Sequence, residues 1–201
     1  MKNLMIAAFA LLTVMGCAED LEAPRADLEA AQSEFEKRLQ TAEDELNVLL
    51  TDLKDSQGMP LKDMLYELRR LRSVSTGHTT VTRPLLASAA EKNQKALDVF
   101  TILLEAQARP SLDVVTFAVE SKSAYEKNTA RSKAVLYGYA QVEERLTRLI
   151  DIGVRMVAER KEREVREALE KQRKEPMWAR LSEPMWEAYK QDAIEKAMKR
   201  R

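Results

Sequence analysis

The chain has little of what most metal and catalytic sites require. Its 201 residues include one histidine, His78, one cysteine, Cys17, and five glycines. Structural zinc sites take several histidine or cysteine ligands, and di-iron sites in helical bundles take two Glu-x-x-His motifs, so the sequence offers neither. The glycines form no phosphate-binding loop. We therefore expect no metal, no cofactor and no enzymatic activity.

Long apolar runs and an excess of charge of one sign are also missing. The chain has 33 Lys and Arg against 33 Asp and Glu, so its formal net charge is zero and nothing in the balance points to nucleic acid. The longest apolar run, Leu4 to Val14, has about eleven residues, whereas a membrane-spanning helix needs roughly 20. This run follows Lys2, and a basic residue followed by a short apolar run is typical of a secretory signal peptide.

The residues after this run, Val14-Met15-Gly16-Cys17, resemble the lipobox of bacterial lipoproteins. The resemblance implies that a signal peptidase cuts between Gly16 and Cys17. It also implies that the Cys17 thiol carries a diacylglycerol and its new amine an acyl chain. Since Cys17 is the only cysteine and cannot form a disulfide within the chain, lipidation also removes a reactive thiol.

The same resemblance predicts a location in the bacterial cell envelope. In Gram-negative lipoproteins an acidic residue directly after the cysteine often retains the protein in the inner membrane. Here that residue is Ala18. We therefore expect the periplasmic face of the outer membrane, with palmitate-type acyl chains as the membrane anchor.

The composition predicts an all-α fold, because charged residues are a third of the chain and Ala, Leu, Glu, Lys and Arg dominate. We expect an elongated antiparallel helical bundle, coiled-coil-like, with one long C-terminal helix and a short terminal helix. A seven-residue repeat predicts the first helix over residues 25–56 and a narrow apolar seam along it. Its members are Leu28, Phe35, Leu39, Ala42, Leu46, Leu49 and Leu53, with Gln32 as the polar exception.

Prolines and clusters of polar residues predict where the remaining helices begin and end. We expect a second helix from Pro60, a surface loop over Ser73–Thr82, a third helix from Pro84 and a fourth from Ser111, with a break near Asn128 left open. Gly153 lies inside the apolar stripe of the fourth helix, and we attribute it to close approach by a neighbouring helix. The predicted organisation is a signal peptide, an acylated cysteine with tether, a helical bundle, a charged helix extension and an amphipathic segment containing tryptophan. Their ranges are 1–16, 17–24, 25–157, 158–174 and 175–201.

The charged extension carries four Glu-to-basic pairs at i,i+4 spacing, which stabilise an exposed helix. They are Glu159–Arg163, Glu162–Arg166, Glu167–Lys171 and Glu170–Lys174. A stalk leaving the bundle and the solvated face of a packed helix both fit this pattern. The final segment repeats Glu-Pro-Met-Trp at residues 175–178 and 183–186, and its second copy opens an amphipathic helix with a basic rim. Its candidate partner-binding residues are Met177, Trp178, Met185, Trp186 and Tyr189.

Three roles stay open for that segment: packing back on the bundle, binding a protein partner or a second copy, and lying on the membrane surface. For the whole chain, the leading hypothesis is a lipid-anchored periplasmic scaffold or adaptor without enzymatic activity. The first alternative is a chaperone- or pilotin-like accessory lipoprotein with an exposed apolar groove, which we place between the first and third predicted helices. The second is a binder of a small molecule or metal in the bundle core, which would contradict the expectation of no cofactor.

Overall fold

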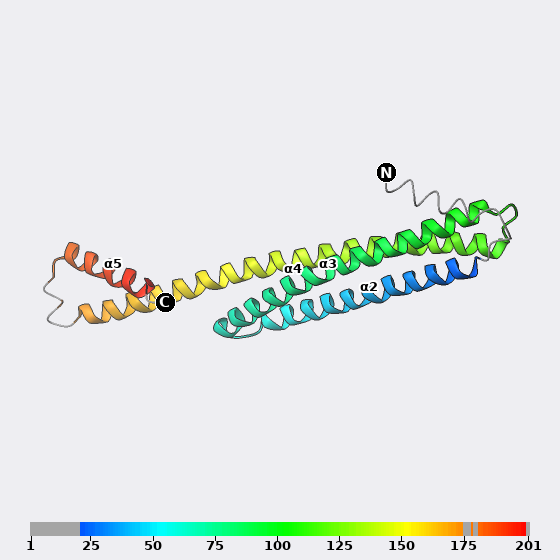
Figure 1. Ribbon diagram of the computed structural model, residues 1–201. Coiled ribbons are helices and arrows are strands. Elements are labelled where there is room, and N and C mark those ends of the chain that lie inside the picture. Colours follow the sequence, from blue (N-terminus) through cyan, green and yellow to red (C-terminus); the bar gives the residue numbers. More distant parts are fainter. Residues whose placement is uncertain (1–20, 175–177, 179–180, 200–201) are drawn as a thin grey trace, which may run out of the picture. The chain divides into compact units, whose positions relative to one another are not determined.

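The structure is a computed structural model that describes residues 21–174, 178 and 181–199. All regular elements among these residues are helices (Figure 1). The prediction of an all-α helical bundle is therefore confirmed. Residues 1–20, with the lipobox and Cys17, and Met177 lie outside the described residues. No helix in the described part is long and apolar enough to cross a membrane. The helices are α2 (Glu22–Ser56), α3 (Leu61–Ala106), α4 (Leu112–Arg173) and α5 (Glu183–Lys199).

The chain divides into two compact units that share the three long helices. Among the described residues, the first combines 21–50 with Ser75–Gln141, and the second combines Thr51–Val74 with the described chain from Val142 onward. The first unit thus contains most of α2, the second part of α3 and the first part of α4. The second unit contains the end of α2, the start of α3, the rest of α4 and α5.

In the first unit, α2 and α4 run parallel to each other and α3 runs antiparallel to both. The amide of Gln32 donates to the Ser121 carbonyl at 3.0 Å, and the Tyr139 hydroxyl donates to the Ala42 carbonyl at 3.1 Å, so residue numbers rise together along α2 and α4. Phe100 of α3 is fully buried in this unit's core. The seam predicted for α2 is buried, apart from a partly exposed Leu46 and the polar Gln32. Its buried members are Leu28, Phe35, Leu39, Ala42, Leu49 and Leu53.

The loop predicted over Ser73–Thr82 is wrong, because α3 continues through it without a break. The hydroxyls of Thr79 and Thr80 donate to the carbonyls four residues earlier, at 2.9 and 2.8 Å, so these polar side chains remain satisfied inside a helix. Ser75 and Thr82 are buried and continue the core-facing stripe of α3 at helical spacing. The stretch therefore has helical periodicity, but polar residues occupy its core-facing positions.

Pro84, predicted to open a helix, lies inside α3 instead. A proline in a helix interior has no N–H for the carbonyl four residues earlier, which costs about 3 kcal/mol. Pro84 is exposed, and the buried Leu86 and Ala89 keep the stripe continuous beyond it. Packing of these neighbours therefore maintains the helix across the proline.

The long helix α4 matches the prediction more closely. It runs unbroken past Asn128, where a break was left open, and the Asn128 side-chain oxygen accepts a hydrogen bond from Arg131 at 3.3 Å. In the second unit, a Cβ added at Gly153 would lie 2.5 Å from Cδ2 of Leu65 in α3. This confirms the predicted close approach of a neighbouring helix at Gly153.

Candidate functional site

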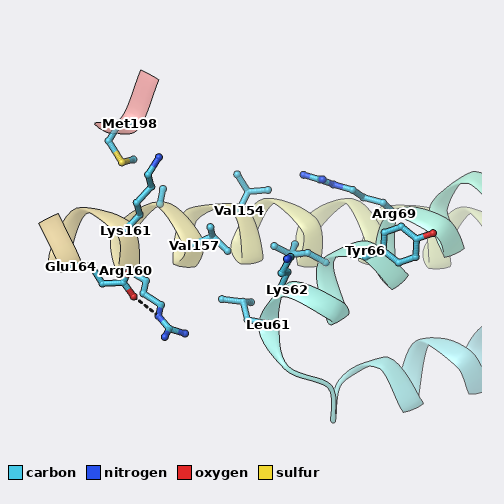
Figure 2. Close-up of a pocket in the computed structure, with 12 residues that line it drawn as sticks. Leu61, Lys62, Tyr66, Arg69, Val154, Val157, Arg160, Lys161, Glu164 and Met198 are labelled. Carbon is cyan, nitrogen blue, oxygen red and sulfur yellow. Dashed lines mark hydrogen bonds and ion pairs between the residues drawn. The ribbon is translucent and has the colours of Figure 1, made fainter. Parts of the chain in front are cut away.

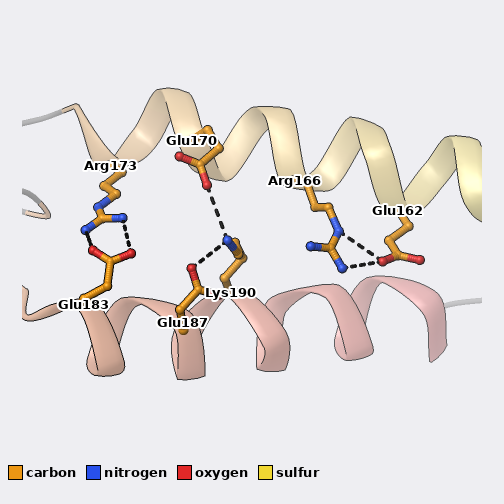
Figure 3. Close-up of polar contacts among 7 residues, drawn as sticks. All are labelled: Glu162, Arg166, Glu170, Arg173, Glu183, Glu187 and Lys190. Carbon is orange, nitrogen blue, oxygen red and sulfur yellow. Dashed lines mark hydrogen bonds and ion pairs between the residues drawn. The ribbon is translucent and has the colours of Figure 1, made fainter.

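The last helix, α5, lies along the end of α4 and is fastened to it by ion pairs (Figure 3). The guanidinium of Arg173 donates to both carboxylate oxygens of Glu183, through Nη1 at 3.0 Å and through Nη2. The amino group of Lys190 lies 3.5 Å from Glu170 of α4 and 2.8 Å from Glu187 of its own helix. Hydrogen bonding to Arg173 lowers the pKa of Glu183 below its usual value. The charged end of α4 is therefore a packed helix with one solvated face, the second of the two predicted arrangements.

Only part of the predicted i,i+4 pairing occurs as expected. Glu162 and Arg166 form their pair at 2.6 Å (Figure 3). Glu170, predicted to pair along α4, instead contacts Lys190 across the two helices. The charges on this stretch thus serve partly to hold α5.

An apolar cluster lies beneath these ion pairs. Trp186 is fully buried and packs with Leu169 of α4 and Ile194 of α5. The rings of Trp178 and Tyr189 stack with centroids 5.0 Å apart, and the guanidinium of Arg173 sits 5.5 Å from the Trp186 ring centroid. The indole N–H of Trp186 is buried and has no hydrogen-bond partner among the described residues.

The structure therefore brings together three of the five predicted partner-binding residues, namely Trp178, Trp186 and Tyr189. It places them against Val165 and Leu169 of α4, in the predicted charged extension (158–174) and not on the predicted bundle (25–157). Met185 is 60% exposed, and it is the most accessible of the four predicted residues that the structure describes. Binding by this segment stays a prediction, with Met185 as its accessible point.

A feature that the sequence analysis missed lies elsewhere in the second unit. A groove of about 820 Å³ runs between the start of α3 and the middle of α4, and Met198 near the end of α5 also lines it (Figure 2). We call it the α3–α4 groove. Its apolar lining residues are Leu61, Leu65, Tyr66, Val154, Val157, Ala158 and Met198.

Positive charge borders the groove. Lys62 and Arg69 line it from α3, and Arg160 and Lys161 line it from α4. The single lining carboxylate, Glu164, is paired with Arg160 at 3.0 Å (Figure 2). Arg160 is the partner of that carboxylate, and the Lys161 ammonium donates to the Ala197 carbonyl of α5, so the positive charge of the rim comes mainly from Lys62 and Arg69.

The groove exists because α4 carries more apolar surface here than its neighbours cover. Ile150 and Gly153 form its buried stripe, yet Val154 and Val157 beside them are 37% and 41% exposed. Such a second stripe next to the core stripe is visible in the sequence. The surface of α3 that faces this stripe is not visible in the sequence, because it depends on how α3 and α4 are aligned along each other.

The only histidine of the chain, His78, belongs to a cluster in the first unit. It is far in sequence from the predicted partner-binding residues. His78 Nδ1 lies 2.9 Å from a carboxylate oxygen of Glu45, and its ring stacks on Tyr139 at 6.3 Å. Burial raises the pKa of the Tyr139 hydroxyl to about 12, and the nearby Glu45 carboxylate adds to this effect. Among residues 21–174, 178 and 181–199, no three His, Cys, Asp or Glu side chains gather as metal ligands would.

The geometry thus defines an all-α protein with an open, basic-rimmed apolar groove on helices. No protein-family model, curated protein or solved structure matches this chain.

Proposed function

We propose that this protein is a lipid-anchored scaffold or adaptor of the bacterial envelope, without enzymatic activity. Its anchor is the acylated Cys17, its location the periplasmic face of the outer membrane, and its binding surface the α3–α4 groove. The anchor and location rest on the lipobox resemblance of Val14-Met15-Gly16-Cys17. The observation that carries the adaptor role is the groove itself, an uncovered apolar surface in the second unit.

Its exposure favours contact with another molecule. Tyr66 is 74% exposed at the groove, and aromatic residues are enriched at protein interfaces. A surface that recognises another protein and a lipid that holds the chain at a membrane together make an adaptor.

The first experiment tests the anchor. Cys17→Ser removes the acylated thiol, so the variant should leave the membrane fraction or accumulate as an uncleaved precursor. A processed Cys17→Ser product that still sediments with membranes would contradict the anchor.

The second experiment tests the adaptor role by photo-crosslinking in cells. A crosslinking amino acid at Tyr66 should capture one envelope protein. The matched control is Tyr137 on α4, which is 66% exposed and does not line the groove. Equal capture at both positions, or none at Tyr66, would contradict docking in the groove.

The same experiment separates the adaptor from a chaperone- or pilotin-like protein. The exposed apolar floor of the groove favours this second candidate as well, because such proteins hold unfolded segments on apolar surfaces. Many unrelated proteins captured at Tyr66, together with strong binding of a dye for apolar surface, would support the chaperone and contradict a dedicated adaptor.

A further inference from the structure

We infer that the α3–α4 groove takes an acidic amphipathic helix of a partner protein, about three turns long. This inference rests on the proposed adaptor function and names the class of partner. Three properties of the groove carry it: its helical floor, its length and the distribution of charge along its rim.

The floor favours a helix. Leu61 and Leu65 lie one turn apart on α3, and Val154 and Val157 lie one turn apart on α4. The contact of Gly153 with Leu65 brings the two helices close together beside these residues. Two adjacent helices present ridges and grooves that a third helix fits.

The length of the groove sets the size of the occupant. Along α4 its lining extends from Val154 to Glu164, about 15 Å at 1.5 Å per residue, and along α3 it extends from Leu61 to Arg69, with Glu164 and Arg69 toward opposite ends (Figure 2). A helix of about 11 residues is long enough to cover the α4 lining, and it presents three or four apolar side chains on one face.

The charges on the rim favour an acidic partner. Lys62 and Arg69 are seven residues apart on α3, so they border roughly 10 Å of the groove. On α4, Arg160 is paired with Glu164 and Lys161 donates to the Ala197 carbonyl, so the α3 side carries the charge that a partner meets. A helix with carboxylates beside its apolar stripe places them near Lys62 and Arg69. A single-headed anionic lipid would match the charge at one end only, since its acyl chain is uncharged.

One side chain at the groove suits an interface anchor. Tyr66 lies on α3 between Lys62 and Arg69 in sequence and is mostly exposed. Tyrosine has few rotatable bonds and a large contact area, and it is enriched among residues that dominate binding energy. We expect its ring to cover an apolar side chain of the bound helix.

The direct test is binding of a synthetic peptide to the purified full-length chain. The probe is a fluorescein-labelled peptide of about 14 residues, with Leu at i, i+3, i+4 and i+7 spacing and Glu on both flanks. Its twin carries Lys in place of every Glu. Fluorescence anisotropy should show saturable binding of the Glu peptide, weakening as salt rises, and none of the Lys peptide. Equal binding of both, or no binding of the Glu peptide at about 1 mM, would overturn the inference.

Variants then locate the binding. The double variant Lys62→Glu/Arg69→Glu and the single variant Val157→Asp should each weaken binding by about tenfold or more. Arg163→Glu is the matched control, because Arg163 is exposed on α4 near Arg160 but does not line the groove. Circular dichroism should show unchanged helix content in all three, since each altered residue is exposed. Unchanged binding in the groove variants, or an equal loss in Arg163→Glu, would overturn the inference.

Two further measurements test other occupants of the groove. Sedimentation of the full chain would overturn the inference if it shows a dimer that Lys62→Glu/Arg69→Glu abolishes, because a second copy then fills the groove. Vesicles of phosphatidylglycerol would also overturn it if they bind in a way that depends on these residues while the Glu peptide does not. The adaptor proposal survives either failure if the crosslinker at Tyr66 still captures one envelope protein, so the two ideas fail separately.

Discussion

Replacing Trp186 by alanine removes the largest fully buried side chain in the described part of the chain. Truncation of a buried tryptophan to alanine costs about 3–5 kcal/mol. The indole N–H of Trp186 has no partner among the described residues, and an unsatisfied buried donor already costs about 1–3 kcal/mol. The net loss should therefore lie at the lower end of the first range, at about 3 kcal/mol.

This loss should act mainly on α5 and on the end of α4 that it covers. An isolated helix of 17 residues is only marginally stable in water, so α5 depends on its packing against α4. A loss of about 3 kcal/mol in docking corresponds to roughly a hundredfold faster amide exchange. Hydrogen exchange followed by mass spectrometry should show this increase in peptides from α5, with peptides from α2 unchanged.

Two variants sharpen the test. Met185→Ala is the matched control, because Met185 is the neighbouring residue and is 60% exposed, so exchange in α5 should change by less than about twofold. Trp186→Phe removes the unpaired N–H and keeps an aromatic ring, so it should accelerate exchange far less than alanine. If Trp186→Ala leaves α5 as protected as Met185→Ala does, the packing of α5 on α4 is refuted.

Three further outcomes follow from other parts of the fold. Pro84→Ala restores a backbone donor inside α3 and should raise the free energy of unfolding by about 1–3 kcal/mol, measured by urea denaturation; an unchanged midpoint would contradict a helix that passes through this residue. Glu183→Gln should speed exchange in α5 at neutral pH. Because Arg173 depresses the Glu183 pKa in the folded state, this stabilisation is present above the unfolded pKa near 4.3 and is lost as pH falls through the folded value, so the difference from wild type should vanish in acid. The Tyr139 hydroxyl should ionise near pH 12 in an absorbance titration, and Tyr139→Phe should abolish the absorbance change there. The raised pKa of Tyr139 stabilises the fold fully below pH 10 and progressively less up to pH 12.

The fold could largely be read from the sequence where apolar periodicity is strong. The heptad repeat predicted the start of α2 to within three residues of its observed position. Gly153 predicted a close helix contact, and Leu65 makes this contact. Both signals are local consequences of helical geometry. The structure therefore adds little to the sequence along α2.

Polar residues at core positions explain the main error in α3. Ser75 and Thr82 sit where an apolar side chain would continue the stripe, so the periodicity disappears from a hydrophobic pattern. The hydroxyls of Thr79 and Thr80 bond to their own helix, which no pattern of apolar residues reveals. Pro84 strengthened the error, because proline is far more common at the start of a helix than inside one.

The α3–α4 groove could not be predicted from sequence for a different reason. Val154 and Val157 mark excess apolar surface on α4, but whether another helix covers it depends on where α3 begins and where α5 ends. Likewise, the aromatic residues of the tail were recognised as a group, whereas their burial against Leu169 depends on the path of the chain between α4 and α5.

The central claim is that the α3–α4 groove is where this protein engages a partner. Photo-crosslinking at Tyr66 in cells, with Tyr137 as control, tests it most directly. The account predicts that Tyr66 captures one envelope protein, that this protein contributes an acidic amphipathic helix to the crosslink, and that Tyr137 captures none. Equal capture at Tyr66 and Tyr137, or no capture at Tyr66, would contradict partner binding in the groove.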